Sequence, residues 1–98
     1  MLILNLECQE DTLIANMRGK LTKKEAYKIE HYVIPFIKKQ KIKHFVCDCT
    51  KLTKMDSEGR YVLLKTKYTL KKQKGTFLLL GVKECLKKDL LKYRMRIH

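Results

Sequence analysis

The sequence predicts an α/β fold: a mixed sheet of four or five strands with three to four helices packed on it. Three observations support this prediction. Runs with the two-residue period of strands alternate with runs that have the three- and four-residue spacing of helices, the last of them over residues 84–92. Residues 76–82 are almost uniformly apolar, as in strands covered on both faces. The 98 residues suffice for one domain with its own core, so we expect no linker or second domain.

The first two strands are predicted to form a hairpin. Residues 1–7 are largely apolar, and residues 12–18 alternate between two faces, with Leu13, Ala15 and Met17 on one of them. Residues 9–11 read as the turn between the strands. Gly19 is expected to break the second strand.

A helix is predicted to begin at Lys23. Thr22 and Glu25 have the spacing of a capping box, in which each side chain binds an amide left free at the helix start. Pro35 should kink or end this helix, with a bend near Tyr32, because proline lacks a backbone donor. The face toward the core is predicted to consist of Ala26, Ile29, Val33 and Ile37 or Phe36.

The segment from Lys43 to Cys49 is predicted as a short buried strand. Phe45, Cys47 and Cys49 share one of its faces, while Asp48 lies on the other. Two thiols on one strand face favour a buried apolar role over redox or metal chemistry.

A long amphipathic helix is predicted next, capped by Asp56 or Ser57 and running to about Gln73. Lysines and a glycine follow at its end, where cations and glycine are favoured. Tyr61 and Tyr68 stand seven residues apart on one stripe, so we expect them to pack against the protein. The residues predicted to face inward are Val62, Leu63, Thr66 and Leu70.

The chain is strongly basic, with 23 lysines and arginines against 10 acidic residues and a net charge of +13. Such a charge attracts nucleic acid, anionic membranes or acidic proteins. The basic residues are spread over polar helix faces and helix ends, and the sequence contains no helix-turn-helix, zinc-finger or aromatic nucleic-acid signature. A solvated surface is favoured first, an acidic protein partner second and nucleic acid last.

The sequence predicts a soluble cytoplasmic protein that is not an enzyme and holds no cofactor or metal. Its four cysteines lack zinc-type spacing and are interpreted as reduced thiols. The apolar start, Met1 to Leu6, is too short for a signal or membrane segment. The sequence has no glycine-rich phosphate loop and no paired carboxylate with a base, and His31, His44 and His98 show no spacing of a metal site or triad.

Ser57 is the residue best suited to carry a switch. It opens the predicted helix between Asp56 and Glu58, a poor setting for a nucleophile but a favourable one for adding charge. A phosphate there would bring about −1.5 to −2 charges to a helix N-terminus, where free amides favour an anion. The fold should tolerate this charge, whereas a docked partner should not. The alternative interpretation of Ser57 is a simple helix cap.

Several short motifs follow one another in a particular order. They are Gly19-Lys20-Leu21-Thr22, Ala26 in the first helix, Cys47-Asp48-Cys49-Thr50, Asp56-Ser57-Glu58-Gly59, and a leucine-rich strand after Gly75. Over nearly the whole chain this order resembles a STAS domain, and within that family the anti-sigma-factor antagonists of bacteria. The resemblance implies that Ser57 is phosphorylated by a serine kinase that doubles as an anti-sigma factor. It also implies that the unphosphorylated form binds this kinase and frees the sigma factor.

The resemblance implies a partner-binding surface around Ser57. Three positions depart from the family pattern, because Thr22 replaces a frequent acid, Glu58 fills the variable position and Arg60 replaces an apolar residue. A carboxylate beside Ser57 is expected to lower affinity for the kinase or partly imitate phosphorylation. The residues expected at this surface are Thr22, Asp48, Thr50, Asp56, Ser57, Glu58, Gly59 and Arg60, with Asp48 and Thr50 either lining the same rim or ordering the loop.

Many STAS domains continue through a last strand and helix, so we expect a C-terminally shortened fold in which Tyr93 to His98 form at most a short edge strand. An uncovered edge or apolar patch would offer a route to self-association or to a partner. Two alternatives to the phosphorylation switch stay open. One is a STAS-like scaffold whose serine is not phosphorylated, and the other is a basic nucleic-acid-binding domain whose binding falls steeply with salt.

Overall fold

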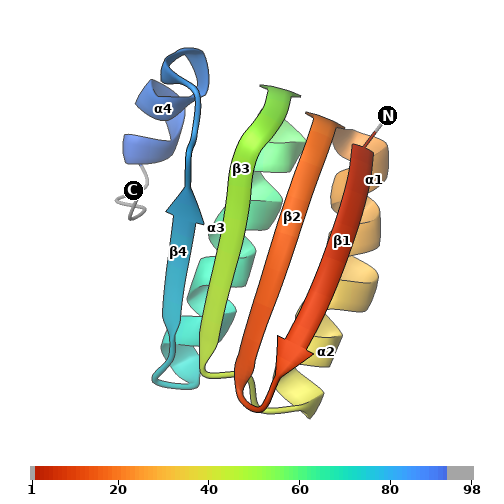
Figure 1. Cartoon of the computed structure of the whole chain (residues 1–98), viewed down its shortest axis with the longest axis vertical. Coiled ribbons are helices and arrows are strands. Elements are labelled where there is room, and N and C mark those ends of the chain that lie inside the picture. Colours follow the sequence, from red (N-terminus) through yellow and green to blue (C-terminus); the bar gives the residue numbers. More distant parts are fainter. Residues whose placement is uncertain (1, 93–98) are drawn as a thin grey trace.

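The four strands form one mixed sheet in chain order, which confirms the predicted fold class. The computed structural model describes residues 2–92 (Figure 1). Strand β1 (Leu2–Gln9) pairs antiparallel with β2 (Thr12–Leu21), as the predicted hairpin requires. Strand β2 then pairs parallel with β3 (His44–Met55), and β3 parallel with β4 (Thr76–Leu80). The edge strand considered for Tyr93 to His98 lies outside the described residues.

Two long helical segments lie side by side behind one face of the sheet (Figure 1). The first is continuous from α1 (Lys23–Lys28) through a π-helical turn, η1 (Ile29–Val33), to α2 (Ile34–Lys39). Helix α3 (Ser57–Lys72) runs beside it in the same direction, and the shorter α4 (Glu84–Leu91) follows β4. The N-termini of α1 and α3 therefore lie at the same end of the sheet.

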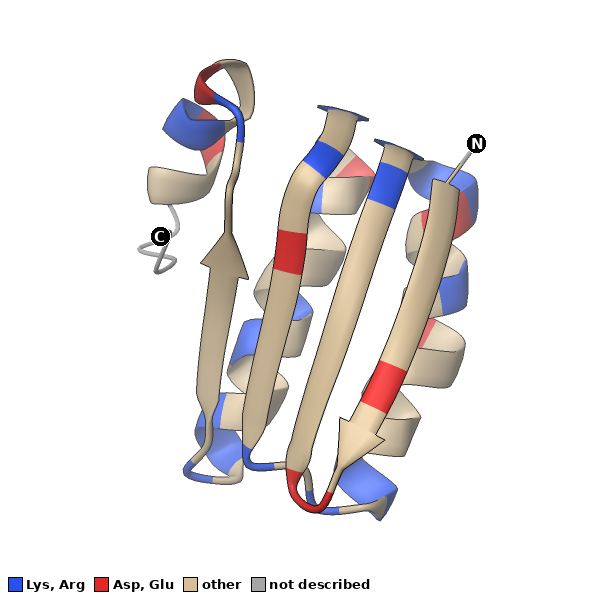
Figure 2. Ribbon diagram, viewed as in Figure 1, with Lys and Arg blue, Asp and Glu red and all other residues tan. Residues whose placement is uncertain are grey.

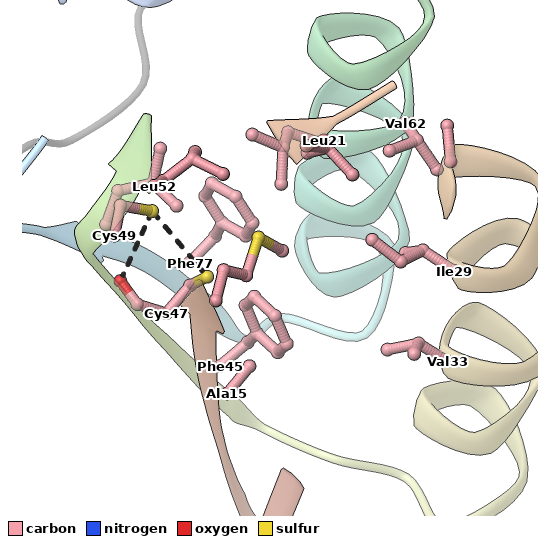
Figure 3. Packing of buried hydrophobic residues seen from close by; sticks show 14 of the residues in the cluster. Ala15, Leu21, Ile29, Val33, Phe45, Cys47, Cys49, Leu52, Val62 and Phe77 are labelled. Atoms are coloured by element: carbon pink, nitrogen blue, oxygen red, sulfur yellow. Dashed lines mark hydrogen bonds between the residues drawn. The ribbon is translucent and has the colours of Figure 1, made fainter. Parts of the chain in front are cut away.

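The core fills the space between the sheet and these helices (Figure 3). Phe45 and Phe77 stack across β3 and β4 with ring centroids 5.5 Å apart. Burial of each such side chain contributes about 1.5–3 kcal/mol to stability. Ile37 is fully buried while Phe36 is 37% exposed, which decides between the two candidates for the helix face. The other predicted inward residues are also buried, namely Ala26, Ile29, Val33, Val62, Leu63, Thr66 and Leu70.

The thiols of Cys47 and Cys49 are buried side by side, as the two-residue period predicts. Their sulfur atoms are 3.7 Å apart, and the Cys49 thiol also points to the Cys47 carbonyl oxygen at 3.8 Å (Figure 3). The hydrogen bond from Cys49 and the burial together raise the pKa of the Cys47 thiol. Both groups act as small apolar core residues.

Two predicted strand ends are wrong, because the strands are longer. Strand β2 passes through Gly19, whose φ of 106° is accessible to glycine, and ends at Leu21. A register shift lies beside this glycine, and the Thr53 hydroxyl donates to its carbonyl oxygen at 3.0 Å. Strand β3 runs to Met55 instead of ending near Cys49. The bulge is on β3, where Thr53 is the extra residue opposite Gly19 and Lys20, and the ladder continues past it.

The prediction that residues 76–82 form a strand covered on both faces is also wrong. Strand β4 has five residues and lies at the edge of the described sheet. Phe77 and Leu79 are buried toward the helices, whereas Leu78 and Leu80 are only half-buried on the opposite face. The apolar run therefore belongs to a strand at the edge of the described sheet, and the second face of this strand is partly exposed.

Pro35 neither ends nor breaks the first helix. It lies in the continuous segment directly after the π-helical turn, and this turn is the form that the irregularity expected near Tyr32 takes. The predicted packing of Tyr61 and Tyr68 is wrong, since their side chains are 53% and 51% exposed. Both tyrosines lie on the outer surface of α3.

Candidate functional site

Ser57 is exposed at the first position of α3. Because β3 runs on to Met55, only Asp56 separates the strand from the helix. The serine hydroxyl is therefore presented to solvent at the helix N-terminus, where free amides and the helix dipole favour an anion.

Asp56 binds the starts of two helices with one carboxylate. Its Oδ1 accepts a hydrogen bond from the Gly59 amide at 2.8 Å, which caps α3. Its Oδ2 accepts one at 3.0 Å from the amide of Lys23, the first residue of α1. The Asp56 amide donates to the carbonyl oxygen of Leu21 at 3.2 Å. The backbone around Ser57 is thus held from both neighbouring elements.

Gly59 allows α3 to approach the end of β2 closely. A Cβ atom added to this buried glycine would lie 2.5 Å from the carbonyl oxygen of Leu21 and 2.9 Å from the Met55 side chain. Backbone cannot move away easily, so any larger residue would push the helix start out of place. Close packing between α3 and the end of β2 therefore requires glycine at the last position of the Asp56 to Gly59 motif.

The capping box predicted for Thr22 and Glu25 does not form. The Thr22 hydroxyl donates to Glu25 Oε2 at 2.8 Å, and neither side chain caps a backbone amide at the start of α1. The amide of Lys23, the first residue of α1, binds Asp56 instead. The hydrogen bond from Thr22 lowers the pKa of the Glu25 carboxyl. Thr22 is half-buried beside Lys23, so the structure does bring it to the Asp56 end of the molecule.

Arg60 is engaged within the protein. Its guanidinium lies 3.4 Å from the Met55 carbonyl oxygen and 3.4 Å from Asp89 Oδ2. These contacts join the start of α3 to α4. Arg60 therefore contributes to this end of the molecule mainly by holding α4 in place.

Asp48 and Thr50 lie apart from Ser57, and their expected place at a strand end is wrong. Both are inside β3, on the sheet face opposite the long helices, where they line a shallow hollow of about 380 Å³ with Asn16 and Arg18. The Asp48 carboxylate accepts from the Thr50 hydroxyl at 2.6 Å and the Thr50 amide at 2.9 Å. These bonds lower its pKa and order a register shift in β3.

Exposed tyrosines near Ser57 were missed by sequence reasoning. Tyr27 and Tyr61 line a small hollow between α1 and α3 together with Lys23 and Glu58. The seven-residue spacing of Tyr61 and Tyr68 suggested a packed stripe, but that stripe faces outward. The residues of α3 that were predicted to face inward lie on the other side of the helix. Their spacing was the signal from which the outward position of the tyrosines could have been predicted.

The charges are distributed unevenly over the fold. Figure 2 shows basic residues on the helices, in the turns and at the ends of β2 and β3, while the sheet between them carries few charges. Lys20 and Lys54 are register partners at the sheet end next to Ser57.

Residues 2–92 contain neither a metal-binding cluster nor a membrane-spanning helix. Within them, no group of three histidine, cysteine, aspartate or glutamate side chains is placed to hold a metal ion. No helix among them has the length and apolarity needed to span a membrane.

Comparisons with known proteins agree with the fold. The STAS domain family matches residues 4–96. No curated protein sequence matches the chain. The anti-sigma factor antagonist SpoIIAA in its unphosphorylated form superposes with a TM-score of 0.86 at 18% identity, covering 98% of this chain and 87% of that one. The phosphorylated SpoIIAA of Bacillus gives 0.79 at 20% identity, with coverages of 98% and 91%. A variant of RsbS from Moorella thermoacetica gives 0.80 at 17% identity, with coverages of 97% and 85%.

Proposed function

This chain belongs to the STAS domain family, and from that premise we propose that it is an anti-sigma-factor antagonist switched by phosphorylation of Ser57. In its unphosphorylated form it binds a serine kinase that is also an anti-sigma factor. It works in the cytoplasm as a protein interaction module, with no cofactor and no reaction of its own.

One observation carries the proposal: the Ser57 hydroxyl is exposed at the N-terminus of α3, directly after the cap residue. The likeness to SpoIIAA in both its unphosphorylated and phosphorylated forms supports it, since a chain of this fold exists in both states. Ser57 is also the sole serine in the sequence. Any phosphoserine within these 98 residues would therefore be at this position.

A phosphate on Ser57 would alter the surface more than the fold. The free amides of the first turn of α3 and the helix dipole favour an added anion. A partner docked on the same surface would desolvate the phosphate beside Asp56 and Glu58. At about 5 Å, each pair of like charges repels by roughly 1–3 kcal/mol. Two such pairs, together roughly 2–6 kcal/mol, would weaken binding by about 30-fold to 20,000-fold.

The proposed partner surface is centred on Ser57. Thr22, Asp56, Glu58 and Gly59 surround it, and Arg60 supports it through α4. Asp48 and Thr50 lie on the opposite sheet face and are left out of this surface.

The experiment is a binding titration of the serine kinase/anti-sigma factor from the same organism, by calorimetry. Ser57→Ala should bind within about threefold of the unmodified protein, and Ser57→Asp should bind at least about tenfold more weakly. Gln9→Asp is the matched control, because it adds a negative charge at the opposite end of the sheet. Incubation with the kinase and ATP should add one phosphate by mass spectrometry, and none to Ser57→Ala. Equal affinity of the Ala and Asp variants would contradict the switch and leave a scaffold role.

A further inference from the structure

A second surface lies farther along the helices, between α2 and α3. The groove there is lined by Ile34 and Lys38 on one wall and by Lys65, Tyr68, Thr69 and Lys72 on the other. We call it the helix groove. Its volume is about 380 Å³, and it is open to solvent along its length.

The floor of the helix groove is closed and well ordered. Ile34 is 7% exposed and Thr69 is 9% exposed, so each shows only a small part of its surface. At one end the Lys65 ammonium pairs with Glu30 across the groove. At the other end the Gln73 side-chain amide donates to the carbonyl oxygens of Ile37 and Ile42, at 3.3 and 2.9 Å. The groove is therefore preformed.

The rim of the helix groove is cationic. Lys38 and Lys72 stand on opposite walls and are exposed, and the structure gives neither of them an ion pair within residues 2–92. Among the described residues that line the groove, the one carboxylate is Glu30, which Lys65 already neutralises. Two separated positive charges thus flank a narrow strip formed by Ile34 and Thr69, with the exposed Tyr68 ring beside it.

Tyr68 provides a large amphipathic surface beside that strip. Its ring is 51% exposed, and tyrosine is enriched where proteins bind one another. Tyr68 and Lys72 continue a stripe of α3 that contains Ser57, Tyr61 and Lys65, at steps of three and four residues. By helix geometry the Lys72 end of the groove is about 22 Å from Ser57.

We propose that the helix groove binds an acidic amphipathic helix of a protein partner. Its apolar stripe would lie over Ile34 and Tyr68, and its carboxylates would pair with Lys38 and Lys72. Two parallel helices leave a groove into which a third helix packs by ridges. The partner is acidic because the rim is positive and the whole chain carries +13.

The groove favours a protein over a nucleic acid. The strip of Ile34 and Thr69 offers nothing to a sugar-phosphate backbone, while it suits leucine or isoleucine side chains. Oligonucleotide binding is therefore a competing outcome of the test.

The test uses a stapled, fluorescein-labelled peptide of about 18 residues, which as a helix spans roughly 27 Å. It carries leucines at three- and four-residue spacing and glutamates on both flanks. A scrambled peptide of the same composition lacks the apolar stripe but keeps the charge. In fluorescence anisotropy at about 150 mM salt, the amphipathic peptide should bind at least about tenfold more tightly than the scrambled one.

Charge reversal locates the binding site. The double variant Lys38→Glu and Lys72→Glu should lose at least about tenfold in peptide affinity. Lys24→Glu with Lys88→Glu changes the net charge equally at exposed positions on α1 and α4, so it should lose less than about threefold. Circular dichroism checks that both double variants are folded. Amide shifts in the nuclear magnetic resonance spectrum should change at the groove residues.

Three results would overturn the proposal: equal binding of the scrambled peptide, equal losses in the two double variants, or a single-stranded oligonucleotide that binds more tightly through the same lysines. Each would show that attraction to the groove is general or directed to nucleic acid. Ser57→Asp should leave peptide affinity within about twofold, because its charge is far from Lys38 and Lys72. Failure of the groove proposal and failure of the Ser57 switch can therefore be distinguished.

Discussion

Asp56 Oδ2 accepts a hydrogen bond from the backbone amide of Lys23, which stands 33 positions earlier in the chain, at 3.0 Å. The other oxygen of the same carboxylate caps α3 through the Gly59 amide. The two long helical segments therefore start from one shared anchor, and Ser57 is attached to it directly.

Asp56→Ala should destabilise the protein by about 2 kcal/mol, because a helix cap and a second charge-assisted hydrogen bond are lost. Asp56→Asn keeps one oxygen to cap α3 but cannot accept at both positions, so it should lose about half as much. Urea unfolding measures both values. Glu58→Ala, at an exposed neighbour, is the control and should change stability by less than about 0.5 kcal/mol. Equal stability of the Asp56→Asn variant and the unmodified protein would show that the bond to Lys23 is not needed.

Gly59→Ala should cost about 3 kcal/mol, near the upper range for overpacking, because the new methyl group would collide with the Leu21 carbonyl oxygen. The expected signs are a lower thermal midpoint and faster exchange of the amides in the first turn of α3. Alanine is the best helix former, so a gain in stability here would mean that the close contact relaxes without cost.

The stability contributed by Asp48 should depend on pH. Its pKa is lowered in the folded state by the Thr50 hydroxyl and amide, so its contribution is present above the unfolded pKa of about 3.9 and is lost as pH falls through the folded value. The thermal midpoint of Asp48→Asn should therefore lie below that of the unmodified protein at pH 7. This difference should vanish toward pH 2.

The control for Asp48 is Thr50→Val, which removes the hydroxyl donor. In that background the effect of Asp48→Asn should be smaller, because only the amide bond is left to lose. If the midpoints of the unmodified protein and of Asp48→Asn differed by the same amount at every pH, this carboxylate would not be the titrating group.

The four cysteines should fall into two classes of reactivity. Cys8 and Cys85 are exposed, whereas Cys47 and Cys49 are buried and the Cys47 pKa is raised. A maleimide reagent at pH 7 should label the two exposed thiols of the native protein within minutes, since reactivity requires an accessible thiolate. All four should react in denaturant. Mass spectrometry counts the labels, and fast native labelling of Cys47 would contradict the buried placement.

The helix faces could be predicted from the sequence because spacing alone determines them. Val62, Leu63, Thr66 and Leu70 recur at helical steps and all lie against the sheet. The alternation of Phe45, Cys47 and Cys49 predicted the buried face of β3 for the same reason. The alternation could not predict where β3 ends, because register shifts near Asp48 and Gly19 interrupt it while the ladder with β2 continues.

The site could be predicted only in part. The exposure of Ser57 followed from a cap residue before an amphipathic run. The bond from the Lys23 amide to Asp56 joins elements that are distant in sequence, so no local motif could predict it. The local motif of Thr22 and Glu25 predicted bonds to backbone amides, whereas the two side chains bind each other. Similarly, the residue with positive φ after α3 is Lys74 at 59°, and Gly75 is needed because a Cβ there would lie 2.4 Å from the Lys43 carbonyl oxygen.

Because of the π-helical turn of Ile29–Val33, the first helical segment can lose one residue without turning its buried face away from the core, whereas α3 cannot. The turn takes up more residues than a regular helical turn, and Ile29 and Val33 within it still face the core together with Ala26 and Ile37. Removing one residue within this turn would tighten it to a regular helix and leave Ala26 and Ile37 on their present sides. The same deletion in α3 would turn polar residues inward. A chain shortened by one residue in this segment should therefore keep the same strand pairing.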